Sequence, residues 1–423
     1  MIKRIIGTSV GKLITALAGF AIIVINAHYI GAVGIGTISL ILLGITFINL
    51  VSNFIGGPAI VYLLPRFDAF RLLVPSYLWA FLCSAAGSVL LSLTRLIPAI
   101  YVFDVFWLSF FVTVTSVNLT ILLAKERFKL YNLLGTLQIL ITLIVLIILV
   151  FFTDNHTVTA YLLSFYAGII LSFVISLFAI RKLIFFSDIE ELPNVVITLL
   201  KYSPFMQFGT FFQMLNYRLS YYIIERFFGP GLLGVFSVGT QVSESVWIVG
   251  RSAATVHYAR MSNTNDMDYA RNLTLVLIKS VAVVTLLLLI IMALLPQGVY
   301  LFLFGAGFGE ARSVVLILAP GMFFTSVTMI ISHYFSGIGI PKYSMYGSAV
   351  GLVMTLGVGF ILIPFLGISG AALTTSLSYL VCMSYLLIIF IRKTSVGYRD
   401  FMIRKSDFLI LRSALEINRK SDL

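Results

Sequence analysis

The stretch LYNLLGTLQILITLIVLIILVFF, residues 130–152, contains no charged residue and is long enough to cross a bilayer as a helix. A hydrocarbon core of about 30 Å needs roughly 20 helical residues, at a rise of about 1.5 Å each. Lipid offers no hydrogen-bond partner to backbone N–H and C=O groups, so helix is the expected conformation. This stretch therefore predicts a transmembrane helix.

Eleven other apolar runs of spanning length surround this stretch. Their approximate bounds are 6–30, 35–63, 72–94, 98–124, 158–180, 202–225, 232–256, 272–295, 311–337, 343–365 and 369–391. Of the whole chain, 60% is hydrophobic and only 10% is charged, whereas soluble domains average about 25% charged residues. The sequence predicts an all-α integral membrane protein with about twelve transmembrane helices.

Lys and Arg are divided unequally between the two ends of these helices. One side receives only Arg95, Arg226 and Arg312. The other side receives Lys3, Arg4, Arg66, Arg71, Lys125, Arg127, Lys129, Arg181, Lys182, Lys201, Arg260, Arg271 and Lys342, and also the basic C-terminal tail. The side richer in Lys and Arg is cytoplasmic by the positive-inside rule. Both termini are therefore expected in the cytoplasm. The net charge of +12 is attributed to basic residues that set the membrane orientation, not to nucleic-acid binding.

The longest internal connection separates six predicted spans from six others. It carries Asp188, Glu190 and Glu191. The expected organisation is an N-terminal lobe (1–182), a cytoplasmic linker (183–201), a C-terminal lobe (202–392) and a basic cytoplasmic tail (393–423). No loop is long enough for a folded soluble domain.

The two halves share a weak internal similarity at an offset of 198 residues. Gly31-Ala-Val-Gly-Ile-Gly36 precedes the second span, and Gly229-Pro-Gly-Leu-Leu-Gly234 precedes the eighth. Glycines at these positions allow a tight turn between antiparallel helices. Six plus six spans in parallel halves suit a transporter that moves about a central cavity.

Charged residues inside predicted spans are costly and mark candidate functional positions. The basic ones are Lys12, Arg218, Arg251 and Lys279, and the acidic one is Glu244. Arg218 lies too deep for simple snorkelling, so we expect it to face a cavity or to pair with Glu225 or Glu244. For Lys12, snorkelling and cavity lining stay open, whereas Lys279 favours snorkelling.

The eighth span has a polar face at helical spacing, and the second span has a milder equivalent. The members are Ser237, Gln241, Glu244, Arg251 and Thr255 in the eighth span, and Ser39, Thr46, Asn49 and Asn53 in the second. Interhelical hydrogen bonds explain the Ser, Thr and Asn positions, whereas Glu244 and Arg251 favour a water-filled cavity. The candidate substrate-binding residues are Lys12, Arg218, Glu244, Arg251, Asn53 and Gln241.

Other chemistry has little support in the sequence. Cys83 and Cys382 lie inside apolar runs and are expected to be buried and unpaired. The four histidines lack ligand spacing with one another, and no Walker loop or G-x-S-x-G motif is present. We expect no catalytic residue, no metal and no cofactor, with coupling to H⁺ or Na⁺ left open.

Three motifs in the second half occur in a characteristic order. They are Leu303-Phe-Gly-Ala-Gly-Phe-Gly-Glu-Ala-Arg312, Gly337-Ile-Gly-Ile-Pro-Lys342 and Leu362-Ile-Pro-Phe-Leu-Gly-Ile-Ser-Gly-Ala-Ala372. Asn26, the Gly31–Gly36 turn, Gly57-Pro58 and Leu64-Pro-Arg66 add to the pattern. In this order they resemble the multidrug/oligosaccharidyl-lipid/polysaccharide (MOP) exporter superfamily, and within it most closely the Wzx-type O-antigen or capsule repeat-unit flippases.

The resemblance implies two six-helix lobes around a central cavity, in the bacterial inner membrane. It implies a flippase that moves undecaprenyl-diphosphate-linked oligosaccharide from the cytoplasmic to the periplasmic leaflet by alternating access. The expected partners are the lipid-linked oligosaccharide, membrane lipids, and glycan polymerase and chain-length machinery. The cavity helices of the family would place Lys12, Arg218 and Arg251 in contact with an anionic substrate.

Three rival functions are weighed against this one. A multidrug exporter of the same superfamily generally needs an embedded carboxylate, and the first span has none, although Glu244 could serve for coupling. A lipid II flippase is expected to have more spans than twelve. A membrane-embedded glycan polymerase is disfavoured by the lack of a large loop.

Overall fold

A computed structural model describes residues 2–57, 59–64, 67–125, 127–183, 192–262, 264 and 266–402. Side chains are described for these residues except 2–13, 62, 182, 192–194, 201–206, 259 and 398. Three expectations therefore concern residues outside the described set: the side chain of Lys12, the middle of the predicted linker (184–191), and most of the basic tail (403–423).

Every regular element in the described part of the chain is a helix. The α-helices are α1 Ile2–Tyr29, α2 Gly31–Ser52, α3 Ala59–Leu63, α4 Ala69–Leu93, α5 Val102–Ala124, α6 Phe128–Phe152, α7 Val158–Ile180, α8 Leu192–Glu244, α9 Trp247–Ser262, α10 Met267–Leu294, α11 Gln297–Phe304, α12 Ala311–Gly337 and α13 Lys342–Thr394. Short 3₁₀ turns lie at Asn53–Ile55, Ala99–Tyr101, Arg181–Leu183, Ala306–Phe308 and Tyr398–Phe401.

The all-α membrane fold is confirmed. Eight helices of the described residues are long and apolar enough to span a bilayer, or nine if one bent pair counts as a single span. Two of the long helices contain a non-helical glycine, Gly229 in α8 and Gly367 in α13. Dividing α8 and α13 at these glycines, and including α1, gives the twelve segments that the sequence predicts.

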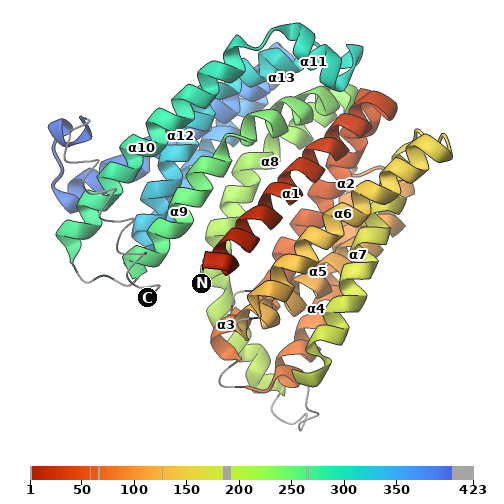
Figure 1. The fold of residues 1–423 in the computed structure, drawn as a ribbon, viewed down its shortest axis with the longest axis horizontal. Helices are drawn as coiled ribbons and strands as arrows, with labels where there is room; N and C mark the ends of the chain where they lie inside the picture. Colours follow the sequence, from red (N-terminus) through yellow and green to blue (C-terminus); the bar gives the residue numbers. More distant parts are fainter. Residues whose placement is uncertain are drawn as a thin grey trace. The chain divides into compact units, whose positions relative to one another are not determined.

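The chain forms two compact units. The N-terminal unit comprises Met1–Phe208 and Leu303–Gly305, and the C-terminal unit comprises Gly209–Phe302 and Ala306–Leu423. Figure 1 shows the helices of each unit bundled side by side, from red to yellow in the first and from green to blue in the second. The change of unit occurs inside α8, and residues 192–201, predicted as linker, are the first turns of that helix.

Large apolar side chains fill the N-terminal unit, where a core cluster joins α2, α4, α5, α6 and α7. It includes the buried residues Ile41, Leu108 and Leu146. Buried polar groups bond locally or across helices. The Asn118 side-chain amide donates to the Ser176 hydroxyl at 2.8 Å, and Tyr77 donates to Asn118. These bonds join α4, α5 and α7, as expected for polar residues that hold membrane helices together.

In the C-terminal unit, α12 packs against α9, α10 and α13. Asn216 on α8 is 2% exposed and accepts hydrogen bonds from Thr355, at 2.7 Å, and from Ser378. Both hydroxyls belong to α13, one on each side of Gly367. This polar contact fixes one face of α8 and leaves a different face for the site described next.

The glycines of the two similar segments share one backbone conformation. Gly31 has a φ of +77° and Gly229 a φ of +76°, a left-handed region that L-residues avoid. Gly31 is the first residue of α2, and Gly229 interrupts α8. The same turn therefore occurs at the same offset in both halves.

The helix breaks within the predicted span 232–256, a feature that the apolar run does not indicate. The helix α8 ends at Glu244, and α9 begins at Trp247. The amides of Ser245, Val246 and Ile248 donate to carbonyls three residues back, at 3.2–3.3 Å, instead of four. The Ser245 hydroxyl also bonds to the Val242 carbonyl at 2.6 Å, a local bond that competes with regular helix.

Candidate functional site

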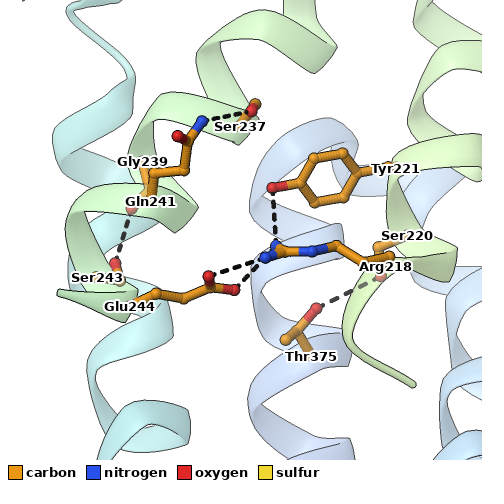
Figure 2. Close-up of polar contacts among 9 residues, drawn as sticks. All are labelled: Arg218, Ser220, Tyr221, Ser237, Gly239, Gln241, Ser243, Glu244 and Thr375. Atoms are coloured by element: carbon orange, nitrogen blue, oxygen red, sulfur yellow. Dashed lines mark hydrogen bonds and ion pairs between the residues drawn. The ribbon is translucent and has the colours of Figure 1, made fainter. Parts of the chain in front are cut away.

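An ion pair lies next to this break in the C-terminal unit. In Figure 2 the Arg218 guanidinium points at the Glu244 carboxylate. Nη1 lies 2.9 Å from Oε1, and Nη2 donates to Oε2, also at 2.9 Å. The side chains are 27% and 14% exposed, respectively. The two nitrogens at the end of the guanidinium thus face the two carboxylate oxygens, and the contact of Nη2 with Oε2 is a charge-assisted hydrogen bond.

Tyr221 supports the same guanidinium from one turn further along α8. Nη1 of Arg218 donates to the Tyr221 hydroxyl at 3.1 Å, and the guanidinium carbon lies 5.2 Å from the ring centroid. The Tyr221 side chain is fixed in turn by an edge-on contact with Phe236, with ring centroids 5.4 Å apart. Packing therefore sets the orientation of Arg218 before any ligand binds.

The contacts of Arg218 use only part of its donor capacity. A guanidinium has five N–H donors. Tyr221 takes one donor of Nη1 and Glu244 takes one donor of Nη2, while Nη1 also lies against Oε1 of Glu244 as an ion pair. Among the described residues no partner is found for the Nε–H and for the second Nη2–H. These two groups form the side edge of the fork, which can bind a second oxyanion in bidentate fashion.

Arg251 lies two turns beyond the break. Its guanidinium carbon is 5.3 Å from the centroid of the Trp247 ring, within the range of a cation–π contact. The Arg251 side chain is exposed and has no ion pair within the described part of the chain. A cation held by a ring and not by a carboxylate keeps its hydrogen-bond donors for a ligand.

Three aromatic rings connect the two arginines. Tyr217 packs on Trp247 at 5.2 Å and on Tyr379 at 5.3 Å between centroids. Trp247 and Tyr379 are 1% and 2% exposed. The indole N–H of Trp247 and the hydroxyl of Tyr379 are buried without a hydrogen-bond partner in the described residues. Such groups are rare in folded proteins and are available to ligand or water oxygens.

The predicted site residues are only partly brought together. Arg218 and Glu244 pair directly, whereas Arg251 lies over Trp247, whose ring packs on Tyr217, the residue before Arg218. Gln241 lies one turn before Glu244, where its side-chain amide donates to the Ser237 hydroxyl at 3.0 Å (Figure 2). Asn53 belongs to the N-terminal unit, where its carbonyl accepts from the Gly57 amide at 3.1 Å.

The proposed polar stripe of the eighth span divides at the break. Glu244 lies before it and is largely buried, whereas Arg251 and Thr255 lie after it and are exposed. Of the alternatives for Arg218, pairing with Glu244 is the one observed. The seventh span has two polar faces, because Asn216 bonds to α13 while Arg218 bonds to Glu244.

The aromatic framework was not predicted. Its members follow helical spacing from the arginines: Tyr221 is three residues after Arg218, and Trp247 is four residues before Arg251. Residues at these separations face each other on a helix, so this signal was present in the sequence. The contribution of Tyr379 carries no such signal, because it comes from a distant helix.

The sequence matches no protein-family model and no curated protein. The fold, by contrast, matches solved structures over nearly its whole length. The lipid II flippase MurJ in an inward closed conformation has a TM-score of 0.76 and 16% identity, covering 98% of this chain and 93% of that chain.

Two structures of MATE transporters show similar agreement. An inward-facing multidrug resistance MATE family transporter of the MOP superfamily has a TM-score of 0.70 and 16% identity, covering 90% of this chain and 94% of that one. A mutant of the Vibrio cholerae MATE transporter VcmN has a TM-score of 0.64 and 14% identity, with coverages of 95% and 98%. The chain has the fold that these MOP-type transporters share.

The match to MurJ also bears on one rival function. Because 93% of the flippase chain is covered, additional spans do not separate it from this protein. The argument that excluded a lipid II flippase by its number of helices is therefore not supported.

Proposed function

We propose that this protein is a MOP-type flippase that moves a lipid-linked oligosaccharide across the bacterial inner membrane by alternating access. The substrate is an undecaprenyl-diphosphate-linked O-antigen or capsule repeat unit, transferred from the cytoplasmic to the periplasmic leaflet. The fold supports a transporter, since flippase and exporter structures share it over 98% and 90% of this chain, respectively.

The observation that carries the proposal is the unused side edge of Arg218. A diphosphate presents several acceptor oxygens, and a guanidinium edge binds two of them with parallel hydrogen bonds. Glu244 stays on the opposite edge and keeps the guanidinium charged and oriented. Arg251 supplies a second cation for the same anionic head group, while the prenyl chain stays in lipid.

The broken helix supports the same assignment. Transporters place substrate sites where membrane helices are interrupted, because the freed backbone groups and nearby charges then face a ligand instead of lipid. The break at Ser245 and Val246 directly follows Glu244. Within the described part of the C-terminal unit, the ion pair of Arg218 and Glu244 thus lies beside an irregular stretch of membrane helix.

The test is surface glycan display in cells that lack the native gene. Arg218→Ala/Arg251→Ala should abolish display, because the diphosphate loses both cationic partners, while membrane quantification shows normal insertion. Arg95→Ala/Arg226→Ala is the matched control, since it removes two exposed arginines outside the site and should leave display intact. Normal display in the Arg218→Ala/Arg251→Ala strain would overturn the assigned role.

The orientation is proposed on the distribution of Lys and Arg. Both termini are assigned to the cytoplasm, so the turn between α12 and α13 lies on the cytoplasmic side. A periplasm-active reporter fused after Lys342 should be silent. Strong reporter activity at that position would reverse the topology.

A multidrug exporter is the second candidate, because Glu244 is a carboxylate embedded in the membrane region and exporters of this fold are among the matches. In that function Glu244 would exchange protons as drug binds. Drug accumulation in cells with and without the protein separates the candidates. A flippase should leave drug accumulation unchanged, whereas an exporter should lower it and should lose this effect in Glu244→Gln.

A further inference from the structure

A cavity lies in the C-terminal unit, among the ends of three helices. Its volume is about 350 Å³, within the range of small-molecule sites. It is lined from the beginning of α10, the end of α12, the turn that follows it, and both ends of α13. The lining residues are Met267, Asp268, Arg271, Tyr334, Phe335, Ile338, Ile340, Tyr343, Lys393 and Thr394.

Two cations and one carboxylate give this cavity a positive balance. Nη2 of Arg271 lies 3.2 Å from Oδ1 of Asp268, and the two side chains are 34% and 81% exposed. A pair so exposed to solvent holds Arg271 weakly. Lys393 is exposed and makes no hydrogen bond or ion pair with any described residue. Both cations are therefore available to an anion.

The rest of the cavity is lined mainly by aromatic and aliphatic residues. Tyr334 and Phe335 are buried at 4% and 1% exposure. Their rings are held by aromatic contacts: Tyr334 lies edge-on to Phe390 at 5.1 Å, and Phe335 is tilted against Tyr343 at 5.0 Å, between centroids. The cavity thus combines cationic groups with a fixed apolar wall, which suits a ligand that has an anionic and an apolar part.

The position of the cavity identifies the source of such a ligand. The helix α10 starts at Met267, α12 ends at Gly337, and α13 starts at Lys342 and ends at Thr394. Each of these helices is apolar enough to span the membrane, so their shared end lies at a membrane–water boundary. Tyrosine and basic residues are typical of that boundary, where lipid phosphates lie.

We infer that this cavity binds the head group of an anionic phospholipid from the adjacent leaflet. Arg271 and Lys393 contact the phosphate, and Tyr334, Phe335 and Tyr343 contact the glycerol and the first acyl methylenes. A lipid bound in this way joins the ends of α10, α12 and α13, so it stabilises the folded C-terminal unit by mass action. The site is separate from Arg218 and Glu244, and it does not depend on the proposed transport function.

Lipid binding to the purified full-length chain tests this inference. Native mass spectrometry would compare phosphatidylglycerol with phosphatidylcholine of the same acyl chains. The wild type should bind phosphatidylglycerol more tightly, by roughly tenfold, because phosphatidylcholine carries beside its phosphate a positive charge that Arg271 and Lys393 repel. Soluble glycerol phosphate should bind more weakly than the lipid, because it does not engage the aromatic wall.

Three variants complete the test. Arg271→Ala/Lys393→Ala should lose the preference for phosphatidylglycerol. Lys125→Ala/Lys129→Ala removes the same charge from exposed positions of the N-terminal unit and should keep it. Asp268→Asn removes the carboxylate that competes for Arg271 and should tighten phosphatidylglycerol binding severalfold, a gain that misfolding cannot produce.

Several results would overturn the site. These are equal binding of the two lipids by the wild type, an unchanged preference in Arg271→Ala/Lys393→Ala, and an equal loss in the control. Binding of glycerol phosphate or inorganic phosphate as tight as that of the lipid would reject a membrane lipid as the ligand. No tightening in Asp268→Asn would show that Arg271 does not contact the phosphate.

Discussion

The second and eighth spans are equivalent in the sequence repeat, but the side chains at matching positions differ in charge. At the offset of 198 residues, Thr46 corresponds to Glu244, and Phe20 corresponds to Arg218. The Thr46 hydroxyl bonds within its own helix, to the Leu42 carbonyl at 2.7 Å. Glu244 instead reaches Arg218 in the preceding segment. A glycine of positive φ precedes both spans, yet among the described side chains of these two pairs of spans an ion pair is found in the C-terminal copy alone.

This difference shows that two equivalent helices can share a backbone arrangement and still carry different functional side chains. The helix α2 is continuous from Gly31 to Ser52, and the segment equivalent to it breaks after Glu244. A charge inside a membrane protein is tolerated when it is paired or faces water. The C-terminal unit meets this requirement by pairing, and retains an arginine edge for a ligand. At the equivalent position the N-terminal unit has a hydroxyl, that of Thr46, which needs only a carbonyl of its own helix.

Removing one partner of the ion pair should have the largest effect on stability. Glu244→Ala leaves the mostly buried Arg218 without its counter-charge, and we expect a loss on the order of 3 kcal/mol. Thr46→Ala, at the equivalent position, should cost less than about 0.5 kcal/mol, as for most substitutions away from a buried network. Thermal unfolding of the purified chains in one detergent measures both.

The double variant Arg218→Phe/Glu244→Thr sharpens the same comparison. It installs the residues of the N-terminal copy, so it removes both charges together and should recover most of the stability that Glu244→Ala loses. It should not restore glycan display, because the arginine is absent. A double variant as unstable as Glu244→Ala would show that the charge left unpaired is not the cause.

The two left-handed glycines should respond alike. Gly31→Ala and Gly229→Ala each force an L-residue to a φ near +77°, at a cost of about 1–2 kcal/mol. No atom lies within 4 Å of either new Cβ position, so backbone strain alone should decide the cost. Equal losses in unfolding experiments support equivalent turns, and a loss at only one glycine would contradict the repeat.

The hydrogen bonds of Asn216 should have the smallest effect. Thr355 and Ser378 each have a second acceptor in the Gly351 carbonyl, at 3.2 and 2.7 Å. Asn216→Ala therefore leaves neither hydroxyl unpaired, and the loss should be about 1 kcal/mol, as is typical of hydrogen bonds between membrane helices. Glycan display should persist, and its loss would place Asn216 in the transport site.

The membrane fold was predictable because one physical rule governs it. Uncharged runs such as 130–152 leave helix as the only conformation that satisfies the backbone in lipid. The break after Glu244 was not predictable in the same way. Hydropathy continues across it, and the bond from Ser245 to Val242 that accompanies it depends on a local conformation.

The site was predictable in its charges but not in its pairing. Arg218, Glu244 and Arg251 are conspicuous because lipid does not tolerate them singly. The sequence left either Glu225 or Glu244 as partner of Arg218, and only packing selects Glu244. Tyr379 lies more than 100 residues from both Tyr217 and Trp247 in the sequence, so the three-ring contact depends on tertiary structure.

Translocation of a diphosphate-linked lipid saccharide in proteoliposomes tests the central assignment most directly. The comparison is between the wild type and Arg218→Lys. Lysine keeps the charge beside Glu244 but lacks the planar fork. The account predicts that Arg218→Lys unfolds at nearly the wild-type temperature. Its translocation rate should nevertheless be at most about one tenth of the wild-type rate, as expected for a lost charge-assisted hydrogen bond. Translocation by Arg218→Lys at the wild-type rate would contradict the account.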